Sequence, residues 1–330
     1  MSHRIGIVGL ATVLAVCGPA WTNARAADWK PVKRIEVVVP NAPGGGNDRI
    51  VRLVLKIAQE HRLIDPVVNV IHKPGAGVVM GLNYLNQFAG DGHHIAIVSS
   101  TFLGDYVSGR SAISPADITP IAQLFTEYVA FAVQPDSPIK TGRDVIARLK
   151  TDVASISASI SGGPGNHNHI ALSMVARAAG GDPKRLKVVV FSSGADAITA
   201  ALGGHVDMVV APAASVLPHV QAGRLRFVAL SAPKRLEGAF ASVPVWKELG
   251  ANVLTANWRA MVGPRGLPQV QTDYWENVFA RVVESDDWKK MLERDLVTNE
   301  FLRSARMRDA LQAEYETLRV AMTELGLVKQ

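Results

Sequence analysis

The sequence predicts an α/β fold made of two similar parts. Short apolar segments with the composition of β-strands alternate with amphipathic helical segments, first near the N-terminus and again through the middle of the chain. At four places a glycine-rich loop joins the end of a predicted strand to the start of a predicted helix. Such alternation is typical of parallel sheets covered by helices, and 330 residues are enough for two medium-sized domains.

The first part of the chain supplies three predicted strands and two predicted helices. The first strand is β-branched (Val37 to Val39) and stops at Pro40, and the helix after it has Ile50, Val51 and Val54 at helical spacing. In chain order we expect a strand at 33–39, a helix at 48–60, a strand at 67–71, a helix at 79–88 and a strand at 94–99.

The middle of the chain repeats this pattern, and the tail is helical. Predicted strands lie at 128–133, 156–161, 186–191, 206–211 and 226–231, and predicted helices at 143–150, 170–179, 195–202 and 214–221. Because this alternation can build a sheet of its own, we expect a second α/β part. The tail from residue 269 has few glycines, and an apolar stripe at helical spacing predicts one amphipathic helix whose Tyr315 and Met322 pack in the core; the stripe is Leu311, Tyr315, Leu318, Met322 and Leu325.

The N-terminus has the pattern of a secretory signal peptide. Arg4 is followed by an apolar run of about a dozen residues, and Ala24 and Ala26 are the small residues expected before a cleavage site. The run is shorter than the roughly 20 residues that a membrane-spanning helix needs. We therefore expect residues 1–26 to be removed and the protein to be periplasmic.

Charge and cysteine content narrow the class of protein. The formal net charge of +6 is spread along the chain, without the run of like charges that marks a nucleic-acid-binding arm, so no nucleic-acid partner is expected. Cys17, the single cysteine, falls in the predicted signal peptide. The exported chain would then have no disulfide and would depend on its core for stability.

The loop PNAPGGGND at 40–48 raises the question of a ligand. Glycines let the backbone approach a ligand closely, and a helix N-terminus offers unpaired N–H groups with a partial positive charge. Together these features form an anion site for a phosphate or a carboxylate. The alternative is a tight turn in which Asn47 or Asp48 caps the helix.

Other kinds of site are less well supported. The run GAGVVMG at 75–81 departs from a dinucleotide fingerprint in its last glycine, and no acidic residue follows at the ribose position. The pairs His93–His94 and His167–His169 lack further ligands at metal spacing, so we expect loop and cap roles and no metal or cofactor. None of the serines lies in a nucleophile elbow, and no catalytic residues are expected.

At these loops the sequence resembles the Bug family, the periplasmic substrate-binding proteins of tripartite tricarboxylate transporters. The similarity covers nearly all of the chain after residue 26. It rests on motifs in the same order, which are PNAPGGGND at 40–48, KPGAG at 73–77, DG at 91–92, SGGPG at 161–165 with His169, FSSG at 191–194, GHVD at 204–207, AGRLR at 222–226 and VP at 243–244.

The resemblance implies a type II periplasmic-binding-protein fold, with two α/β domains around a ligand cleft and a two-strand hinge. It places domain 1 at 27–128 and 248–330 and domain 2 at 129–247. It implies a monomer that closes over a small carboxylate and passes it to a large and a small membrane subunit encoded separately. The alternatives are a sensor subunit of the same fold that feeds a signalling partner, and a periplasmic α/β enzyme.

The resemblance also implies which residues bind the ligand. Backbone amides and hydroxyls of two glycine loops would grip one carboxylate with little help from arginine or lysine. Departures from the usual family pattern at Asn166 and Phe191 fall where selectivity for the ligand is expected. The expected ligand-binding residues are Asn41, Pro43, Gly44, Gly45, Gly46, Asn47, Asp48, Gly77, Ser99, Ser100, Thr101, Phe102, Ser161, Gly163, Gly165, Asn166, His169, Phe191, Ser192, Asp196, Asp207 and Pro212.

Overall fold

The computed structural model describes residues 29–75, 78–161 and 163–328. The predicted signal peptide and Gly77 lie outside these residues. Within the described ranges, no helix is both long enough and apolar enough to cross a membrane.

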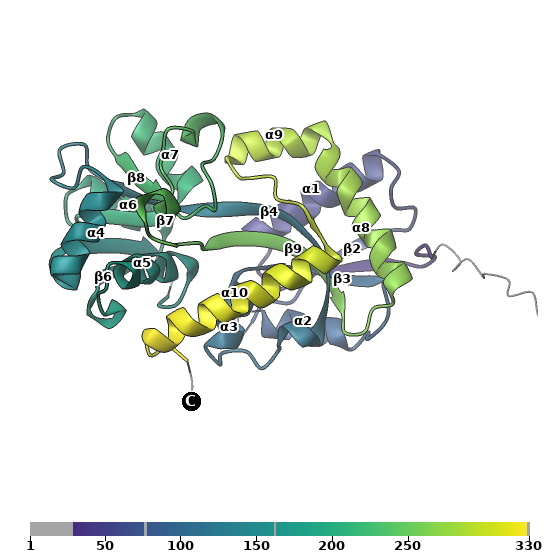
Figure 1. Cartoon of the computed structure of the whole chain (residues 1–330). Helices are drawn as coiled ribbons and strands as arrows, with labels where there is room; N and C mark the ends of the chain where they lie inside the picture. Colours follow the sequence, from purple (N-terminus) through teal and green to yellow (C-terminus); the bar gives the residue numbers. More distant parts are fainter. Residues whose placement is uncertain (1–28, 76–77, 162, 329–330) are drawn as a thin grey trace, which may run out of the picture.

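The elements alternate along the chain much as the sequence predicts (Figure 1). The strands are β1 (Ile35–Val39), β2 (Val68–His72), β3 (His94–Ser99), β4 (Ile118–Val133), β5 (Ser157–Ser161), β6 (Lys187–Phe191), β7 (Met208–Pro212), β8 (Arg226–Leu230), β9 (Ala256–Pro264) and β10 (Leu302–Arg303). The helices are α1 (Gly46–Glu60), α2 (Val79–Asn86), α3 (Thr101–Val107), α4 (Gly142–Thr151), α5 (His167–Ala178), α6 (Gly194–Leu202), α7 (Ala213–Gln221), α8 (Gln269–Glu284), α9 (Asp286–Asp295) and α10 (Ser304–Glu324).

The strands form two half-sheets that share β4. The order along the main path is β2-β1-β3-β9-β4-β7-β5-β6, with β8 and β10 also paired to β4. The pairs β1–β2, β1–β3, β5–β6 and β5–β7 are parallel, as the alternation predicts, whereas β4 and β9 run antiparallel to their neighbours. The mixed α/β architecture that the sequence predicts is confirmed.

The long strand β4 joins the two halves. Its pairing with β9 ends at Tyr128, and its pairing with β7 begins at the next residue, Val129. Each half has its own buried apolar clusters, and the cluster around β5 and α5 extends to Ala251 and Val253. The chain therefore crosses between the halves through β4 and returns through the residues just before β9. The domain limits drawn from the resemblance remain a prediction.

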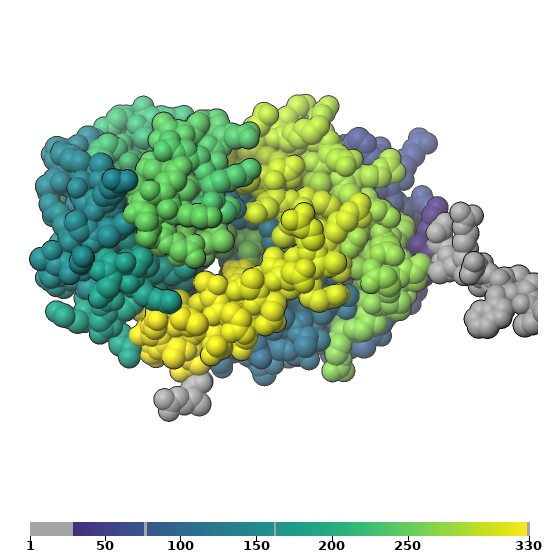
Figure 2. Space-filling model, viewed as in Figure 1, coloured from purple at the N-terminus to yellow at the C-terminus, as the bar shows by residue number. Residues whose placement is uncertain are grey.

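The helix α10 makes a third link between the halves. The predicted stripe is confirmed, because Leu311, Leu318 and Met322 are buried in one cluster with Ile170 of α5. At its C-terminal end, Glu324 lies 3.4 Å from Arg177 of α5. Figure 2 shows α10 in yellow, running from one half to the other below a hollow between them.

Two elements near this junction were not foreseen from the sequence. The short helix α3 follows β3 directly, and β9 lies in the middle of the first half-sheet, between β3 and β4. The strand β9 was missed because its sequence mixes Asn257 and Arg259 with apolar residues.

Candidate functional site

The loop 40–48 is held in shape by the carboxylate of Asp48. Its Oδ2 accepts hydrogen bonds from Gly44 N (2.8 Å) and Arg52 Nε (3.0 Å), and its Oδ1 lies 2.8 Å from His72 Nε2. Burial alone would raise the pKa of Asp48, but these hydrogen bonds outweigh burial and lower the pKa to about 2. Asp48 is therefore ionised, and its contacts organise the loop, whose Gly44 has a positive φ of 80° that suits glycine.

The helix that follows this loop begins without a side-chain cap. The N-cap residue is Gly45, so the alternative of a cap by Asn47 or Asp48 is wrong. The side chain of Asn47 instead donates to Asn41 Oδ1 at 2.6 Å. Among the hydrogen bonds of the described residues, none uses the N–H groups of Gly46, Asn47 or Asp48. These three donors and the positive end of the helix dipole are free for an anion.

A guanidinium group faces this helix start. A methyl group built on Gly46 would lie 4.0 Å from Nη2 of Arg259, which β9 supplies. Arg259 Nη1 donates to Asn257 Oδ1 (2.6 Å) and to Trp258 O (3.1 Å). Burial lowers the pKa of Arg259, and the charge of nearby Glu127 opposes that shift. Among the described residues no carboxylate forms a direct ion pair with Arg259. Asn257 nevertheless links Arg259 to Glu127, because its Nδ2 donates to Glu127 Oε2 at 3.1 Å.

The second glycine loop uses its polar groups internally. Asn166 is the N-cap of α5, and its Oδ1 accepts from His169 N at 3.0 Å while its Nδ2 donates to Ser161 O. Nδ1 of His169 accepts from Gly165 N at 3.0 Å, and burial lowers the pKa of His169, which favours the neutral ring that this hydrogen bond needs. The loop and cap role predicted for His169 is confirmed, and Gly163 is exposed at the tip.

A small cavity of about 50 Å³ lies where the two halves meet. His167 Nε2 is buried there without a hydrogen-bond partner among the described residues, and burial together with the charge of Arg259 lowers the pKa of His167 to about 4. Ser100 Oγ donates to Asn257 Oδ1 at 3.1 Å, so the cavity adjoins the Arg259 network. Residues of both halves line it, among them Ser100, Thr101, Asn166, His167, Thr255 and Glu314.

The structure therefore brings together many of the predicted site residues of the first half. Ser99, Ser100 and Thr101 lie at the end of β3, where Ser99 pairs with Arg259 of β9. Phe102 is a correction: its side chain is fully buried in the core between α2, α3 and α10, so it does not line the cleft. Asn41, Pro43 and Gly44 are exposed in the loop before α1.

The predicted residues of the second half separate into two groups. Ser192 and Asp196 lie at the N-terminus of α6, whose N-cap is Ser193, and Asp196 accepts hydrogen bonds from the hydroxyl groups of Ser192 and Ser193. Phe191 and Pro212 end β6 and β7 at the same edge. Asp207 is a correction, because it binds Ser157 N and Oγ at the opposite, amino-terminal ends of β5 and β7.

The chain matches one family model over most of its length. Residues 50–309 match the model described as the tripartite tricarboxylate transporter family receptor, TctC. The matched span runs from within α1 to within α10 and includes the strands β2 to β10. The chain belongs to this receptor family.

Individual members are similar to this receptor at low identity. A UPF0065 protein of Cupriavidus necator is 26% identical over 99% of this chain and 98% of its own. A TctC solute-binding protein from Polaromonas, solved without ligand, has a TM-score of 0.82 and 23% identity over 89% of this chain and 99% of its own. MatC of Rhodopseudomonas palustris, solved with bound malate, has a TM-score of 0.64 and 20% identity over 88% of this chain and 99% of its own. These solved structures confirm the periplasmic-binding-protein fold.

Arg259, which lies beside the start of α1, was not among the residues predicted from the sequence. Arg259 and Asn257 alternate along β9 with Trp258, Ala260 and Val262, which are buried on the other face. This alternation is a strand signal of period two. A polar residue on the open face of such a strand could have been recognised as a candidate for the cleft.

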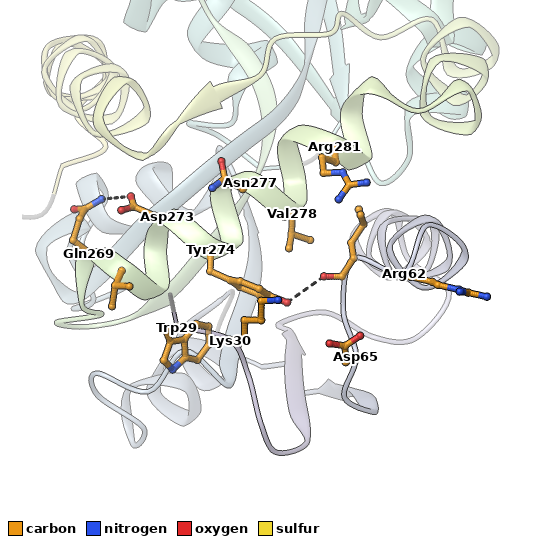
Figure 3. A pocket seen from close by; sticks show the side chains of 12 residues that line it. Trp29, Lys30, Arg62, Asp65, Gln269, Asp273, Tyr274, Asn277, Val278 and Arg281 are labelled. Carbon is orange, nitrogen blue, oxygen red and sulfur yellow. Dashed lines mark hydrogen bonds between the residues drawn. The ribbon is translucent and has the colours of Figure 1, made fainter. Parts of the chain in front are cut away.

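A cavity larger than the one between the halves lies away from the hinge. It has a volume of about 710 Å³ and lies between α8 and the turn that follows α1 (Figure 3). Its side chains carry both signs of charge, including Arg62, Asp65 and Asp273, and Tyr274 donates a hydrogen bond across it to Leu63 O at 3.1 Å. No element of the second half contributes to it, so it is not the cleft between the two halves.

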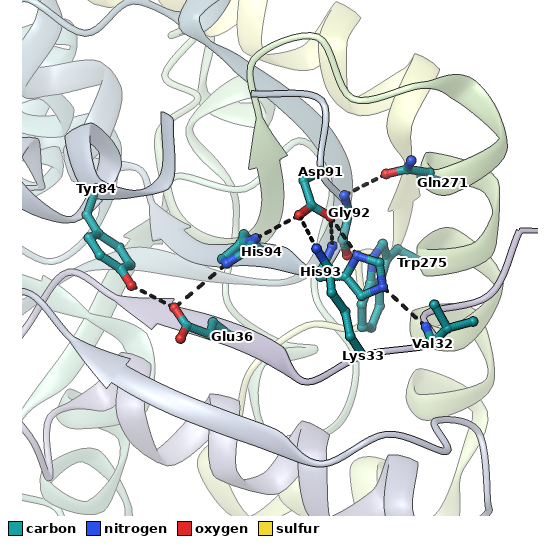
Figure 4. Close-up of polar contacts among 10 residues, drawn as sticks. All are labelled: Val32, Lys33, Glu36, Tyr84, Asp91, Gly92, His93, His94, Gln271 and Trp275. Atoms are coloured by element: carbon teal, nitrogen blue, oxygen red, sulfur yellow. Dashed lines mark hydrogen bonds and ion pairs between the residues drawn. The ribbon is translucent and has the colours of Figure 1, made fainter. Parts of the chain in front are cut away.

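The adjacent histidines of the first half have structural roles (Figure 4). His93 Nδ1 lies 2.6 Å from Asp91 Oδ1, and His93 Nε2 accepts from Val32 N at 3.2 Å. His94 stacks on Phe88 with ring centroids 3.6 Å apart. The loop role predicted for this pair is confirmed for His93, whereas His94 is the first residue of β3. Among the described residues, no group of His, Cys, Asp or Glu side chains could hold a metal ion.

Proposed function

We propose that this receptor is a periplasmic solute-binding protein that captures a small organic carboxylate for a tripartite tricarboxylate-type transporter. The receptor would close over the acid as a monomer and pass it to a large and a small membrane subunit. The predicted signal peptide and the family support the periplasmic location and the transport role.

The observation that carries this proposal is the guanidinium of Arg259, which has no direct ion pair among the described residues, beside the uncapped start of α1. The N–H groups of Gly46, Asn47 and Asp48 have no partner among the described residues, and the guanidinium lies close to Gly46, the first of these residues. Two positive groups this close repel each other unless an anion lies between them. A planar carboxylate suits both partners, because guanidinium can bind it with two parallel hydrogen bonds and a helix start can donate to it from the backbone.

The relatives support a carboxylate over other anions. MatC, a structural neighbour, was solved with malate, and another neighbour from Rhodopseudomonas palustris was solved with adipate. Both ligands are carboxylates held by proteins of the same fold. The direct ion pair with Arg259 is a departure from the expectation that backbone and hydroxyl groups act with little help from arginine.

The arrangement of the chain supports closure by a hinge. Two crossings, β4 and the residues before β9, connect the halves, and the ligand groups of Arg259 and Asn257 lie directly beside the return crossing. A ligand that contacts both halves favours the closed form by its differential affinity. Closure should appear as a smaller radius of gyration in X-ray scattering when ligand is added.

A thermal-shift screen of the mature protein tests the proposal. Protein stripped of co-purified ligand is mixed with mono-, di- and tricarboxylates, and an acid that binds only the folded state raises the melting temperature. We expect at least one acid to do so, and mass spectrometry should recover it unchanged. No shift for any acid would overturn the carboxylate assignment, and conversion of the acid would favour an enzyme.

The variant Arg259→Gln tests whether the guanidinium of Arg259 binds the carboxylate. It keeps a planar polar group but removes the charge, and a hydrogen bond to a charged partner is worth about 1.5–3 kcal/mol. We expect affinity for every acid found in the screen to fall at least tenfold. Arg308→Gln, an exposed arginine of α10, is the matched control and should leave affinity unchanged.

A further inference from the structure

The cavity of about 50 Å³ has a mixed lining, in which polar side chains lie beside Gly104, Gly165 and Leu318. A buried cavity needs roughly 10–15 Å³ for each water molecule, so this one can hold a hydroxyl or amino group together with a few waters. Ser100, Thr101 and Thr255 line it with hydroxyl groups, and the unpartnered Nε2 of His167 is buried beside them. A buried polar atom without a partner is costly, which makes a polar occupant favourable.

Glu314 is the acidic residue among those that line this cavity. The carboxyl group comes from α10, and its Oε2 accepts a hydrogen bond from Trp258 Nε1. Its other oxygen, Oε1, takes part in none of the hydrogen bonds of the described residues. Burial raises the pKa of Glu314 to about 7, while the hydrogen bond from Trp258 opposes the shift. Because this pKa lies near neutrality, both protonation states of Glu314 are populated, and the ionised form can accept a hydrogen bond from a ligand.

The charges around the cavity leave no surplus cation for a second carboxylate. Arg110 also lines it, but its Nε and Nη2 lie 2.9 Å and 2.8 Å from Asp105 Oδ1, so its charge is already balanced. His167 is neutral, because its pKa lies near 4. A second carboxylate placed here would meet Glu314 and Asp105 as well as Arg110, and like charges in a partly buried site repel.

The cavity and the anion site are two ends of one cleft. Asn257 Oδ1 accepts hydrogen bonds from both Arg259 and Ser100, and Ser100 lines the cavity. His167 lines the cavity and is close enough to Arg259 for the guanidinium charge to lower its pKa. A ligand anchored by its carboxylate at Arg259 can therefore extend a polar substituent toward Glu314.

We propose that the ligand of this receptor is a monocarboxylate that carries a hydrogen-bond donor, such as a hydroxy acid, whose donor group binds Glu314 in this cavity. The inference rests on the proposed carboxylate-binding function and names the substrate class for the same site. A donor-bearing ligand can donate directly to the carboxylate of Glu314, whereas an unsubstituted acid leaves Glu314 to water alone. Sites built to hydrogen-bond a substituent discriminate strongly against analogues that lack it.

The test compares four-carbon acids of matched length by titration calorimetry. The probes are butyrate, the 2-, 3- and 4-hydroxybutyrates and succinate, each with the wild-type receptor and with Glu314→Gln. For the wild type we expect at least one hydroxybutyrate to bind at least tenfold more tightly than both butyrate and succinate. In Glu314→Gln, which keeps an acceptor for Trp258 but removes the negative charge, the preference over succinate should fall at least tenfold.

Two controls keep the outcome clear. Glu316→Gln makes the same chemical change on an exposed turn of α10 and should alter nothing. If acids bind and Arg259→Gln weakens them, but succinate equals or exceeds every hydroxybutyrate in the wild type, this inference is overturned while the carboxylate function stands. If none of these acids nor any acid of the wider screen binds, the carboxylate function itself fails. The wild-type comparison decides the matter even if Glu314→Gln does not fold.

Discussion

The two glycine loops of the cleft look alike in sequence but leave different groups free. The loop 40–48 ends in a helix with no side-chain cap, and three of its N–H groups have no partner among the described residues. The loop 161–169 ends in a helix capped by Asn166, and His169 takes a further amide hydrogen bond. The first loop therefore has backbone N–H groups available for a ligand, whereas the N–H groups of Gly165 and His169 in the second loop are already hydrogen-bonded within the protein.

The two loops differ in the number of free N–H groups because their polar side chains stand at different positions relative to the helix start. Asp48 stands in the first turn of its helix and reaches back to Gly44 N, so it shapes the loop from behind and leaves the helix start open. Asn166 stands at the N-cap and closes the helix start itself. Of the two loops, the one before α1 therefore leaves more backbone donors for an anion, because its N-cap residue, Gly45, has no side chain to accept from them.

The largest expected effect comes from Asp48→Asn. The amide has the size of the carboxylate but cannot accept from Gly44 N, Arg52 and His72 together, so the loop loses charge-assisted hydrogen bonds. We expect a loss of about 2 kcal/mol in the free energy of unfolding. Affinity for the acid should fall by more than tenfold. Urea denaturation measures the loss of stability, and titration calorimetry measures the loss of affinity.

The acid dependence of stability tests the same residue. Because the pKa of Asp48 is lowered from 3.8 to about 2 in the folded protein, its stabilisation is complete above pH 4 and is lost as the pH falls toward 2. The stability difference between wild type and Asp48→Asn should therefore shrink across that window. A difference that stays constant from pH 5 to pH 2 would show that Asp48 does not act through its charge.

The free amides of α1 can be tested with Gly46→Pro. Proline is well tolerated at the first helical position, and Gly45 has the extended ψ of 174° that a residue before proline prefers. The change removes one N–H that is unpaired among the described residues, so we expect unchanged or slightly higher stability. Affinity should fall about tenfold, because one hydrogen bond to the charged ligand is lost.

The matched control for this change is Asp286→Pro at the first position of α9. The N-cap Ser285 there also has an extended ψ, of 151°, and Asp286 is exposed on the outside of the first half. We expect no change in affinity. Full affinity in Gly46→Pro would contradict the direct role of the α1 amides and would leave Arg259 as the main anion contact.

Features of the fold that depend on residues close together in the sequence could be predicted, whereas contacts between residues far apart in the sequence could not. The strand–loop–helix units and the α10 stripe follow from local periodicity, and they were predicted to within a few residues. Arg259 and Glu314 enter the cleft from β9 and α10, far from the glycine loops in sequence, so no local pattern links them. Phe102 and Asp207 were wrongly predicted to bind the ligand. A sequence motif indicates which segment lies near a site, but it does not show which way each side chain points.

A smaller effect is expected from Asn166→Ala. The cap of α5 is lost, which typically costs about 1 kcal/mol. Because Asn166 satisfies its own helix, affinity should fall only a few fold. Thr141→Ala removes the equivalent cap of α4, whose hydroxyl accepts from Asp144 N, and should cost similar stability without any change in affinity. Complete loss of binding in Asn166→Ala would mean that the two loops contact the ligand equally.

The smallest effect on binding is expected from Asp207→Asn. Asp207 Oδ2 accepts from Ser157 N (2.8 Å) and Ser157 Oγ (2.6 Å) at the amino ends of β5 and β7, so the change should cost about 1 kcal/mol of stability. Affinity should stay within twofold of the wild type, because ligands of α/β sheets bind beyond the carboxyl ends of the strands. A selective loss of affinity with unchanged unfolding would place part of the ligand site at the opposite edge of the sheet, and the contrast between the two loops would then no longer account for binding.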